Sequence, residues 1–239
     1  MGGFPTTEHT YKQFDAELES IRSQVLQMGG LVESQIQRAL EGFTEGKPDL
    51  LDEVIADDAK VNALEVAIDE DCALIIARRQ PAAIDLRIVM TVIKTITDLE
   101  RIGDEAEKIA RNAKLFLESG KVKTIRLAEI RHAADLATDM LRDALDAFAR
   151  LDVLAALEVV KQDERVDVEF RSILRQLITF MMEDPRTIST SLEILFIAKA
   201  IERIGDHAKN MAEYVIYLVK GKDVRHVSIE EIEREAMKP

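Results

Sequence analysis

Apolar residues recur along this 239-residue chain at the three- and four-residue spacing of amphipathic helices. The first stripe includes Leu18, Ile21, Val25, Met28 and Val32, and later stripes are separated by short stretches that contain proline or glycine. The stripes and the breaks between them predict six long helices. Their approximate bounds are Thr10–Gly42, Pro48–Arg79, Ala82–Glu118, Ile125–Arg150, Val153–Glu183 and Thr187–Lys220.

The second half of the chain repeats the first half. LERIGDEAEKIA (Leu99–Ala110) and IERIGDHAKNMA (Ile201–Ala212) share the core ERIGD at a shift of 102 residues. DAKVN (Asp58–Asn62) lies in the second predicted helix where DERVD (Asp163–Asp167) lies in the fifth. Because short connections favour antiparallel neighbours, the repetition predicts an all-α fold of two tandem three-helix bundles.

The run SGKVKT after the third helix marks the boundary between the two predicted domains. The first three-helix repeat is therefore expected at 1–120, and the second, with a short C-terminal tail, at 121–239. After Gly221 the chain should leave the bundle. Ser228 and Glu231 then form a capping-box pattern that predicts a short terminal helix.

Both repeats carry acidic residues on the helix faces that continue their apolar stripes. Residues four apart lie on one face, because an α-helix turns about 100° per residue. Position along the bundle gives a second test, because two antiparallel helices bring residues that are equally far from their connecting turn to the same height. Asp58 lies 23 residues before the turn at Pro81, and Asp104 lies 23 after it. The same comparison around Pro185 matches the second set. The residues that meet are Asp58, Asn62, Glu100 and Asp104 in the first repeat, and Asp163, Asp167, Glu202 and Asp206 in the second.

Carboxylates within a bundle are costly unless they are protonated, paired with cations or bound to metal. We predict that these eight residues form two metal sites, although ordinary exposed charges beside the core are the alternative. Oxygen ligands suit Mg²⁺, Ca²⁺ and Mn²⁺, and iron also accepts them, so the ligand type alone does not identify the metal. The candidates we name are Fe, Mn, Mg and Zn. The glycines before two of the aspartates, Gly103 and Gly205, would allow a close approach at these sites.

Other acidic residues fit the pattern less well. Weaker candidates for metal binding are Glu65, Asp69 and Glu107. On the fourth helix, aspartates also recur every fourth residue, but they point away from the apolar stripe and are predicted to be solvated. These are Asp135, Asp139 and Asp143.

Composition restricts the kinds of partner and the cellular location that we expect. The net charge of −13, with no dense Lys/Arg run, argues against a nucleic-acid partner. No apolar stretch reaches the ~20 uncharged residues of a membrane span, and the start has no signal-peptide core, so we expect a cytoplasmic protein without direct membrane insertion. Cys72 is the only cysteine and lies in an apolar stripe, which predicts a buried small hydrophobe.

Catalytic patterns are missing from the sequence. It contains no nucleophile arrangement and no phosphate-cradling glycine loop, and its histidines are scattered, so we do not expect an enzyme. A di-iron oxidase would need two inward Glu-x-x-His motifs, whereas only Glu129 with His132 has this spacing and it faces outward. A metal-dependent enzyme or a metal-storage bundle stays the alternative function.

Several segments resemble the PhoU family, in order and spacing, from Tyr11 to about Val227. They are FDAELESIRSQVLQMGGLVE, VNALEVAIDE, ARRQPAAIDLR and LERIGD, followed by MMEDPRTI and IERIGD in the second half. The resemblance implies two three-helix bundles whose paired E(D)xxxD motifs can hold multinuclear metal clusters. Those motifs map onto Glu100/Asp104 and Glu202/Asp206. Asn62 departs from the acidic pattern, which implies weaker metal binding in the first repeat.

The resemblance also implies a function and partners. It implies a negative regulator of the phosphate-starvation response that modulates phosphate uptake. The partners would be the phosphate ABC transporter, through its ATPase, and the phosphate-sensing histidine kinase. Because three-helix units leave apolar area that is hard to cover fully, we also expect a homodimer.

Overall fold

The computed structural model describes residues 12–119 and 127–238, which form seven α-helices and one short 3-10 helix. The first repeat contains α1 (Lys12–Glu45), α2 (Pro48–Arg79) and α3 (Ile84–Glu118). The second contains α4 (Leu127–Arg150), α5 (Val153–Glu183), η1 (Pro185–Thr187) and α6 (Ile188–Lys220), and the tail forms α7 (Ile229–Ala236). None of the helices in these ranges is both long and apolar enough to cross a membrane.

The six predicted long helices are confirmed, with small differences at their ends. α1 continues three residues further than expected, to Glu45. α3 begins two residues later, at Ile84, because the preceding Ala83 has a φ of 49° that does not fit a right-handed helix. The predicted helix starts at Thr10 and Ile125, and the boundary between residues 120 and 121, lie outside the described residues.

Local sequence signals explain where the helices begin and end. Pro48 occupies the first turn of α2, where its missing N–H costs nothing, and α2 ends at Gln80 in the left-handed region with a φ of 49°. Asp152 caps α5 by accepting hydrogen bonds from two backbone N–H groups at 3.0 Å. Gly221 ends α6 with a φ of 71°, and Ser228 caps the short terminal helix α7, as its sequence predicted.

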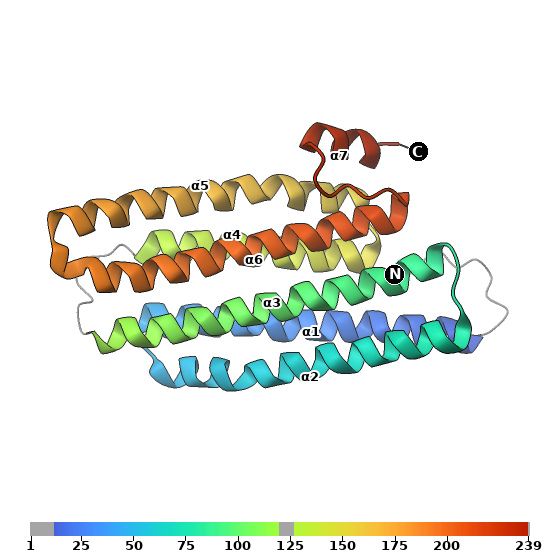
Figure 1. The fold of residues 1–239 in the computed structure, drawn as a ribbon, viewed down its shortest axis with the longest axis horizontal. Coiled ribbons are helices and arrows are strands. Elements are labelled where there is room, and N and C mark those ends of the chain that lie inside the picture. Colours follow the sequence, from blue (N-terminus) through green and yellow to red (C-terminus); the bar gives the residue numbers. More distant parts are fainter. Residues whose placement is uncertain (1–11, 120–126, 239) are drawn as a thin grey trace.

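The two repeats stack side by side (Figure 1). α3 packs along α6, α1 lies next to α4, and α2 and α5 form the outer edges of the molecule. α3 and α6 run antiparallel: Arg87 near the start of α3 donates a hydrogen bond to the carbonyl of Leu218 near the end of α6. The all-α fold of two repeated three-helix bundles is thus confirmed. α7 packs on α5 and α6 at one end of the second bundle.

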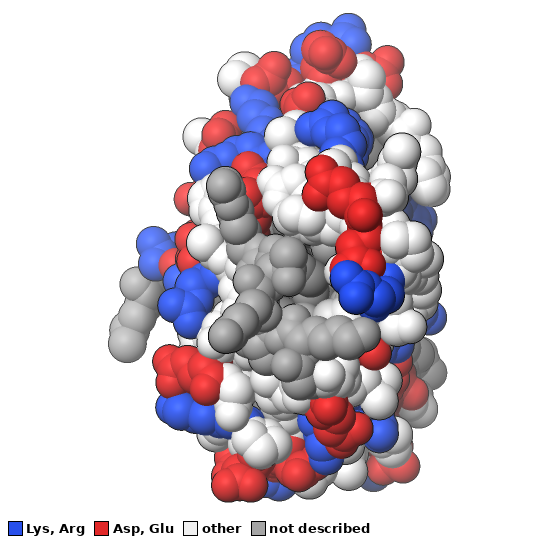
Figure 2. Space-filling view, turned by 90° about the vertical axis from the view of Figure 1, so that its left-hand side faces the viewer, with Lys and Arg blue, Asp and Glu red and all other residues white. Residues whose placement is uncertain are grey.

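The interior of both bundles is largely apolar. Phe43 and Phe116 pack edge to face with ring centroids 5.4 Å apart. Cys72 is fully buried, and burial raises the pKa of its thiol to about 12, which confirms its prediction as a small hydrophobe. On the end of the molecule shown in Figure 2, acidic and basic side chains are interspersed.

Candidate metal sites

The first acidic site consists of Asp58 and Asn62 on α2 with Glu100 and Asp104 on α3. All four side chains are half-buried. They therefore line the rim between the two helices. The sequence pattern, by contrast, suggests that they lie in the core itself. Beneath them Val61 from α2 packs against Gly103 of α3.

Two buried oxygens of the first acidic site lack a hydrogen-bond partner. Nδ2 of Asn62 donates to Oδ2 of Asp58 at 3.0 Å, whereas Oδ1 of Asp58 and Oδ1 of Asn62 are buried without a hydrogen-bond partner. Burial, followed by the charges of Glu107 and Asp104, raises the pKa of Asp58. An unpartnered buried oxygen is costly, so this site favours a ligand that supplies positive charge or donors.

Glu100 completes the same electrostatic group from α3. Burial raises the pKa of its carboxyl first, and the charges of Asp104, Glu65 and Asp58 raise it further. The structure thus brings Asp58, Glu100 and Asp104 close enough to repel one another. Within residues 12–119 and 127–238, none of the four residues of the first acidic site forms an ion pair.

The second acidic site consists of Asp163 and Asp167 on α5 with Glu202 and Asp206 on α6. Three of its carboxylates are paired with cations of their own repeat. Nζ of Lys209 lies 2.6 Å from Oδ2 of Asp163, and Nη2 of Arg171 lies 2.7 Å from Oδ2 of Asp167. Glu202 pairs with Lys199, so most of the charge of this site is already neutralised.

Asp206 differs from the other members of the second acidic site. Its side chain reaches solvent in a hollow of about 620 Å³ that also contains Lys209, His207 and the tail residue Arg225. The surrounding protein raises the pKa of Asp206 by desolvation, and the charges of Glu202 and Asp163 raise it further. Electrostatic repulsion within this site therefore acts mainly on the carboxyl of Asp206.

The side chains of the first acidic site offer oxygen atoms, which are the ligands that hard cations prefer. In the described part of the chain, no three His, Cys, Asp or Glu side chains converge as ligands of one ion. Amide oxygens also bind hard cations, however, and the buried Oδ1 atoms of Asn62 and Asp58 are both unpaired. Asp58, Asn62, Glu100 and Asp104 would hold the ion, which would supply positive charge between the two helices.

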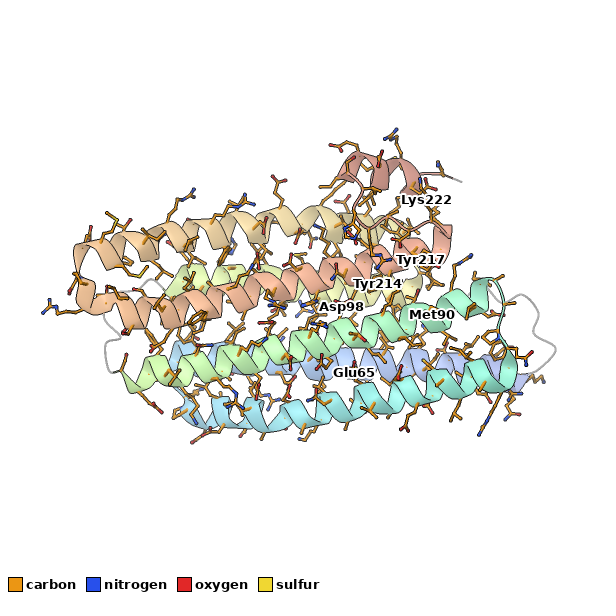
Figure 3. All side chains as sticks on the ribbon, viewed as in Figure 1. Glu65, Met90, Asp98, Tyr214, Tyr217 and Lys222 are labelled. Atoms are coloured by element: carbon orange, nitrogen blue, oxygen red, sulfur yellow. The ribbon has the colours of Figure 1, made fainter. Side chains whose placement is uncertain are left out.

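The weaker candidates separate into two groups. Glu65, labelled in Figure 3, is half-buried beside the first acidic site, while Asp69 is exposed. Glu107 pairs with Arg111 at 2.6 Å and is not free to bind an ion. All three aspartates of α4 that were predicted to be solvated are exposed: Asp135, Asp139 and Asp143.

The two glycines beside the sites accommodate the neighbouring helix. A Cβ on Gly103 would lie 3.3 Å from Cγ1 of Val61, and one on Gly205 would lie 3.4 Å from Cγ1 of Val166. The close approach expected at these positions is therefore made by a valine of the preceding helix, and the same contact recurs in both repeats.

A polar network between the repeats was not anticipated from the sequence. Asp98 on α3 is buried and contacts Nδ1 of His207 at 2.7 Å and Nδ2 of Asn210 at 3.2 Å, both on α6. Asp98 and Tyr214 lie together between the helices (Figure 3), and burial with the charge of Asp98 raises the pKa of Tyr214. Glu105 on α3 is also buried, and its Oε1 forms an ion pair with Nε of Arg203 on α6 at 3.0 Å.

The spacing of two acidic residues along α3 is the sequence signal for this network. Asp98 and Glu105 are seven residues apart and therefore share a helix face, distinct from the face that packs within the first bundle. A central helix between two bundles needs two buried faces. The apolar stripe of α3 marks only one of these two faces.

Comparisons with known proteins agree with this architecture. The family model described as PhoU domain matches residues 25–113 and again residues 130–215. A Pseudomonas putida protein named "Phosphate-specific transport system accessory protein PhoU homolog" is 48% identical over 229 residues, which are 96% of this chain and 89% of that protein.

Solved structures give the same result. The crystal structure of PhoU from Pseudomonas aeruginosa matches with a TM-score of 0.85 at 48% identity, over 88% of this chain and 100% of that one. The crystal structure of the phosphate transport system regulatory protein PhoU from Streptococcus pneumoniae matches with a TM-score of 0.82 at 29% identity, over 89% of this chain and 99% of that one. The likeness therefore includes both repeats.

Proposed function

The chain belongs to the PhoU family, and we propose on that basis that it is an accessory protein that regulates phosphate transport. The observation that carries this proposal is the match of both repeats to the PhoU domain, together with 48% identity over 96% of the chain to a relative named for the phosphate-specific transport system. Its action would then consist in presenting helical surfaces to partners.

The finer proposal is a negative regulator of the phosphate-starvation response. It would link the ATPase of the phosphate ABC transporter to the phosphate-sensing histidine kinase and so modulate uptake. An exposed apolar stripe on α6 supports a protein contact: Ile188, Leu192 and Phe196 share one face and are 42%, 39% and 56% exposed. This stripe would serve a partner or a second copy of the chain in the homodimer that we also propose.

Metal binding belongs to the proposal, with a preference between the two sites. The sequence suggested weaker binding in the first repeat because Asn62 removes one charge. The ion pairs favour the opposite order, because a cation at the second site would have to displace Lys209, Lys199 and Arg171. At the first site it would meet unpaired oxygens. We therefore propose that the first acidic site is occupied first.

Gene deletion tests the regulatory role. Output of the phosphate-starvation response is measured in phosphate-rich medium in the wild type, in the deletion strain and in strains complemented with the wild type or with Glu100→Gln/Asp104→Asn. The proposal predicts high output in the deletion strain and restored repression with the wild-type gene. Unchanged output after deletion would contradict it, whereas repression by the variant would remove only the metal from regulation.

The alternative function, a metal-dependent enzyme or metal store, is tested on the purified protein. Metal-loaded protein is assayed for phosphoester and peroxide turnover, and its metal content per chain is measured. Turnover, or storage of many ions per chain, would favour the alternative over the regulator.

A further inference from the structure

Gln35 is a buried amide on α1 without a partner. Its side chain is 0% exposed, and neither Oε1 nor Nε2 has a hydrogen-bond partner. A buried amide that makes no hydrogen bond destabilises the folded protein, because it has given up its hydrogen bonds to water. Helix formation does not require a polar residue at this position, since the surrounding α1 residues Val32, Ile36 and Ala39 are fully buried and apolar.

The Gln35 amide lies beside Gly103, where Val61 also packs, and both of these residues adjoin members of the first acidic site in the sequence. Its Oε1 is 3.5 Å from the place where a Cβ on Gly103 would sit, and Val61 borders the same place. Gly103 precedes Asp104 along α3, and Val61 precedes Asn62 along α2. Glycine at 103 therefore leaves the space into which the amide of Gln35 extends, between the two helices that carry the site.

The second repeat has no such amide. RALEGF in α1 corresponds to DALDAF in α4 at a shift of 105 residues, which places Met140 where Gln35 stands. Met140 is buried like Gln35, but it is apolar. At Gly205 the three nearest atoms to an added Cβ all belong to Val166. A buried polar residue beside the glycine is thus a feature of the first repeat.

Three buried oxygens on α1 and α2 thus lack a hydrogen-bond donor near the first acidic site. Oε1 of Gln35, Oδ1 of Asn62 and Oδ1 of Asp58 are all buried and all lack a donor. Neutral amide oxygens are good ligands for hard divalent cations, either directly or through a bound water. They would complete a site in which carboxylates alone do not converge.

We propose that Gln35 belongs to the first acidic site. Its amide oxygen would contact the bound ion, directly or through a water, and so help this site to select a hard divalent cation. The inference rests on the proposed binding of a cation at this site. It makes the site a three-helix one, in which a bound cation ties α1 to α2 and α3. The cost of the unpartnered amide in the metal-free protein is then recovered when the ion binds.

The test compares Mn²⁺ affinity and thermal unfolding of the full chain, without a histidine tag, in four proteins: wild type, Gln35→Met, Met140→Leu and Glu100→Gln/Asp104→Asn. Gln35→Met installs the residue found at the equivalent position of the second repeat, so the fold should be kept. We expect its metal-free form to melt at the same temperature as the wild type or higher. Its Mn²⁺ affinity should fall about tenfold, as for other supporting residues of metal sites, while Met140→Leu should change neither quantity.

The outcomes separate the inference from its premise. Wild-type affinity in Gln35→Met, with loss of binding in Glu100→Gln/Asp104→Asn, would overturn the role of Gln35 and keep the site. Wild-type binding in Glu100→Gln/Asp104→Asn would overturn both. A second measurement needs no variant at position 35: the side-chain NH₂ signals of Gln35 should shift when Mg²⁺ is added to the wild type, and an absence of any shift would contradict the inference.

Discussion

Glu213 on α6 is a carboxyl whose ionisation opposes folding. It is 8% exposed, and burial raises the pKa of its carboxyl from 4.5 to about 7, with Lys209 and Arg225 partly offsetting the effect. Below pH 4.5 the group is protonated in the folded and the unfolded chain. As the pH rises from 4.5 to 7, the unfolded chain loses this proton first, so stability falls across that window.

Replacement of Glu213 by Gln should remove this pH dependence. At pH 4.5 the variant and the wild type should have nearly the same free energy of unfolding. Above pH 7 the variant should be more stable, by up to about 3 kcal/mol, because the wild type must ionise a buried carboxyl. Urea unfolding at a series of pH values measures the difference. A difference that stays constant with pH would contradict the assignment.

Single residues of the candidate site were predictable where helical spacing decides their place. Spacing of four placed Asp58 with Asn62 on one face, and the hydrogen bond between them agrees. Helical spacing also indicates the pairs Lys199–Glu202 and Arg171–Asp167, which lie three and four residues apart, whereas the pair Lys209–Asp163 joins two helices and depends on their packing. The proposed order of the two sites rests on these ion pairs.

At the scale of elements, α7 is a short helix held by few contacts. It has eight residues, too few for a stable isolated helix, and it buries Ile232 and Ala236 against the second bundle. Its charged side chains pair with the bundle and tail, as Glu233 does with Lys161 at 2.5 Å. We infer that α7 can detach while the two bundles stay folded.

Replacement of Ile232 by Ala tests this independence. A buried Ile→Ala change in a continuous core costs about 2–5 kcal/mol. Here the loss in global stability should stay below about 1 kcal/mol, because detachment of α7 limits it. Proteolysis between residues 221 and 228 should accelerate several-fold, while the matched control Ile229→Ala, at a side chain that is 41% exposed, should leave the rate unchanged. A large drop in melting temperature with unchanged proteolysis would show that α7 is integral to the fold.

The helices themselves were predictable, because proline, glycine and capping residues mark their ends and apolar stripes fix their inner faces. α2 and α5 agree with the sequence at both ends. The start of α3 was less predictable, since nothing in the sequence around Ala83 signals its positive φ. The second buried face of α3 also depends on where the other bundle packs, which is a tertiary property.

At the scale of the whole molecule, the contact between α3 and α6 joins the repeats. Asp98 links them by its contacts with His207 and Asn210, and Lys94 lies over the rings of Tyr214 and Tyr217, 5.3 Å from each centroid. Polar contacts of this kind fix the relative position of two bundles, because an apolar contact alone would tolerate sliding. The repeat is visible in the sequence, whereas this docking is not.

A double-mutant cycle measures the strength of this link. Asp98→Ala and His207→Ala should each destabilise the protein. The loss in the double variant should be smaller than the sum of the single losses by about 1–2 kcal/mol, since the two side chains share one buried contact. Urea unfolding gives the three differences. Additive losses would mean that the contact contributes nothing to the docking of the repeats.

The central claim is that two repeats of similar fold carry unequal cation sites, with the first site preferred because its oxygens are unpaired. Anomalous diffraction from crystals of the full chain, grown with a slight molar excess of Mn²⁺, tests it most directly. The account predicts the strongest anomalous peak among Asp58, Asn62, Glu100 and Asp104, and a weaker peak or none at Asp163 and Asp206. A peak confined to the second acidic site, or no peak at either, would contradict it.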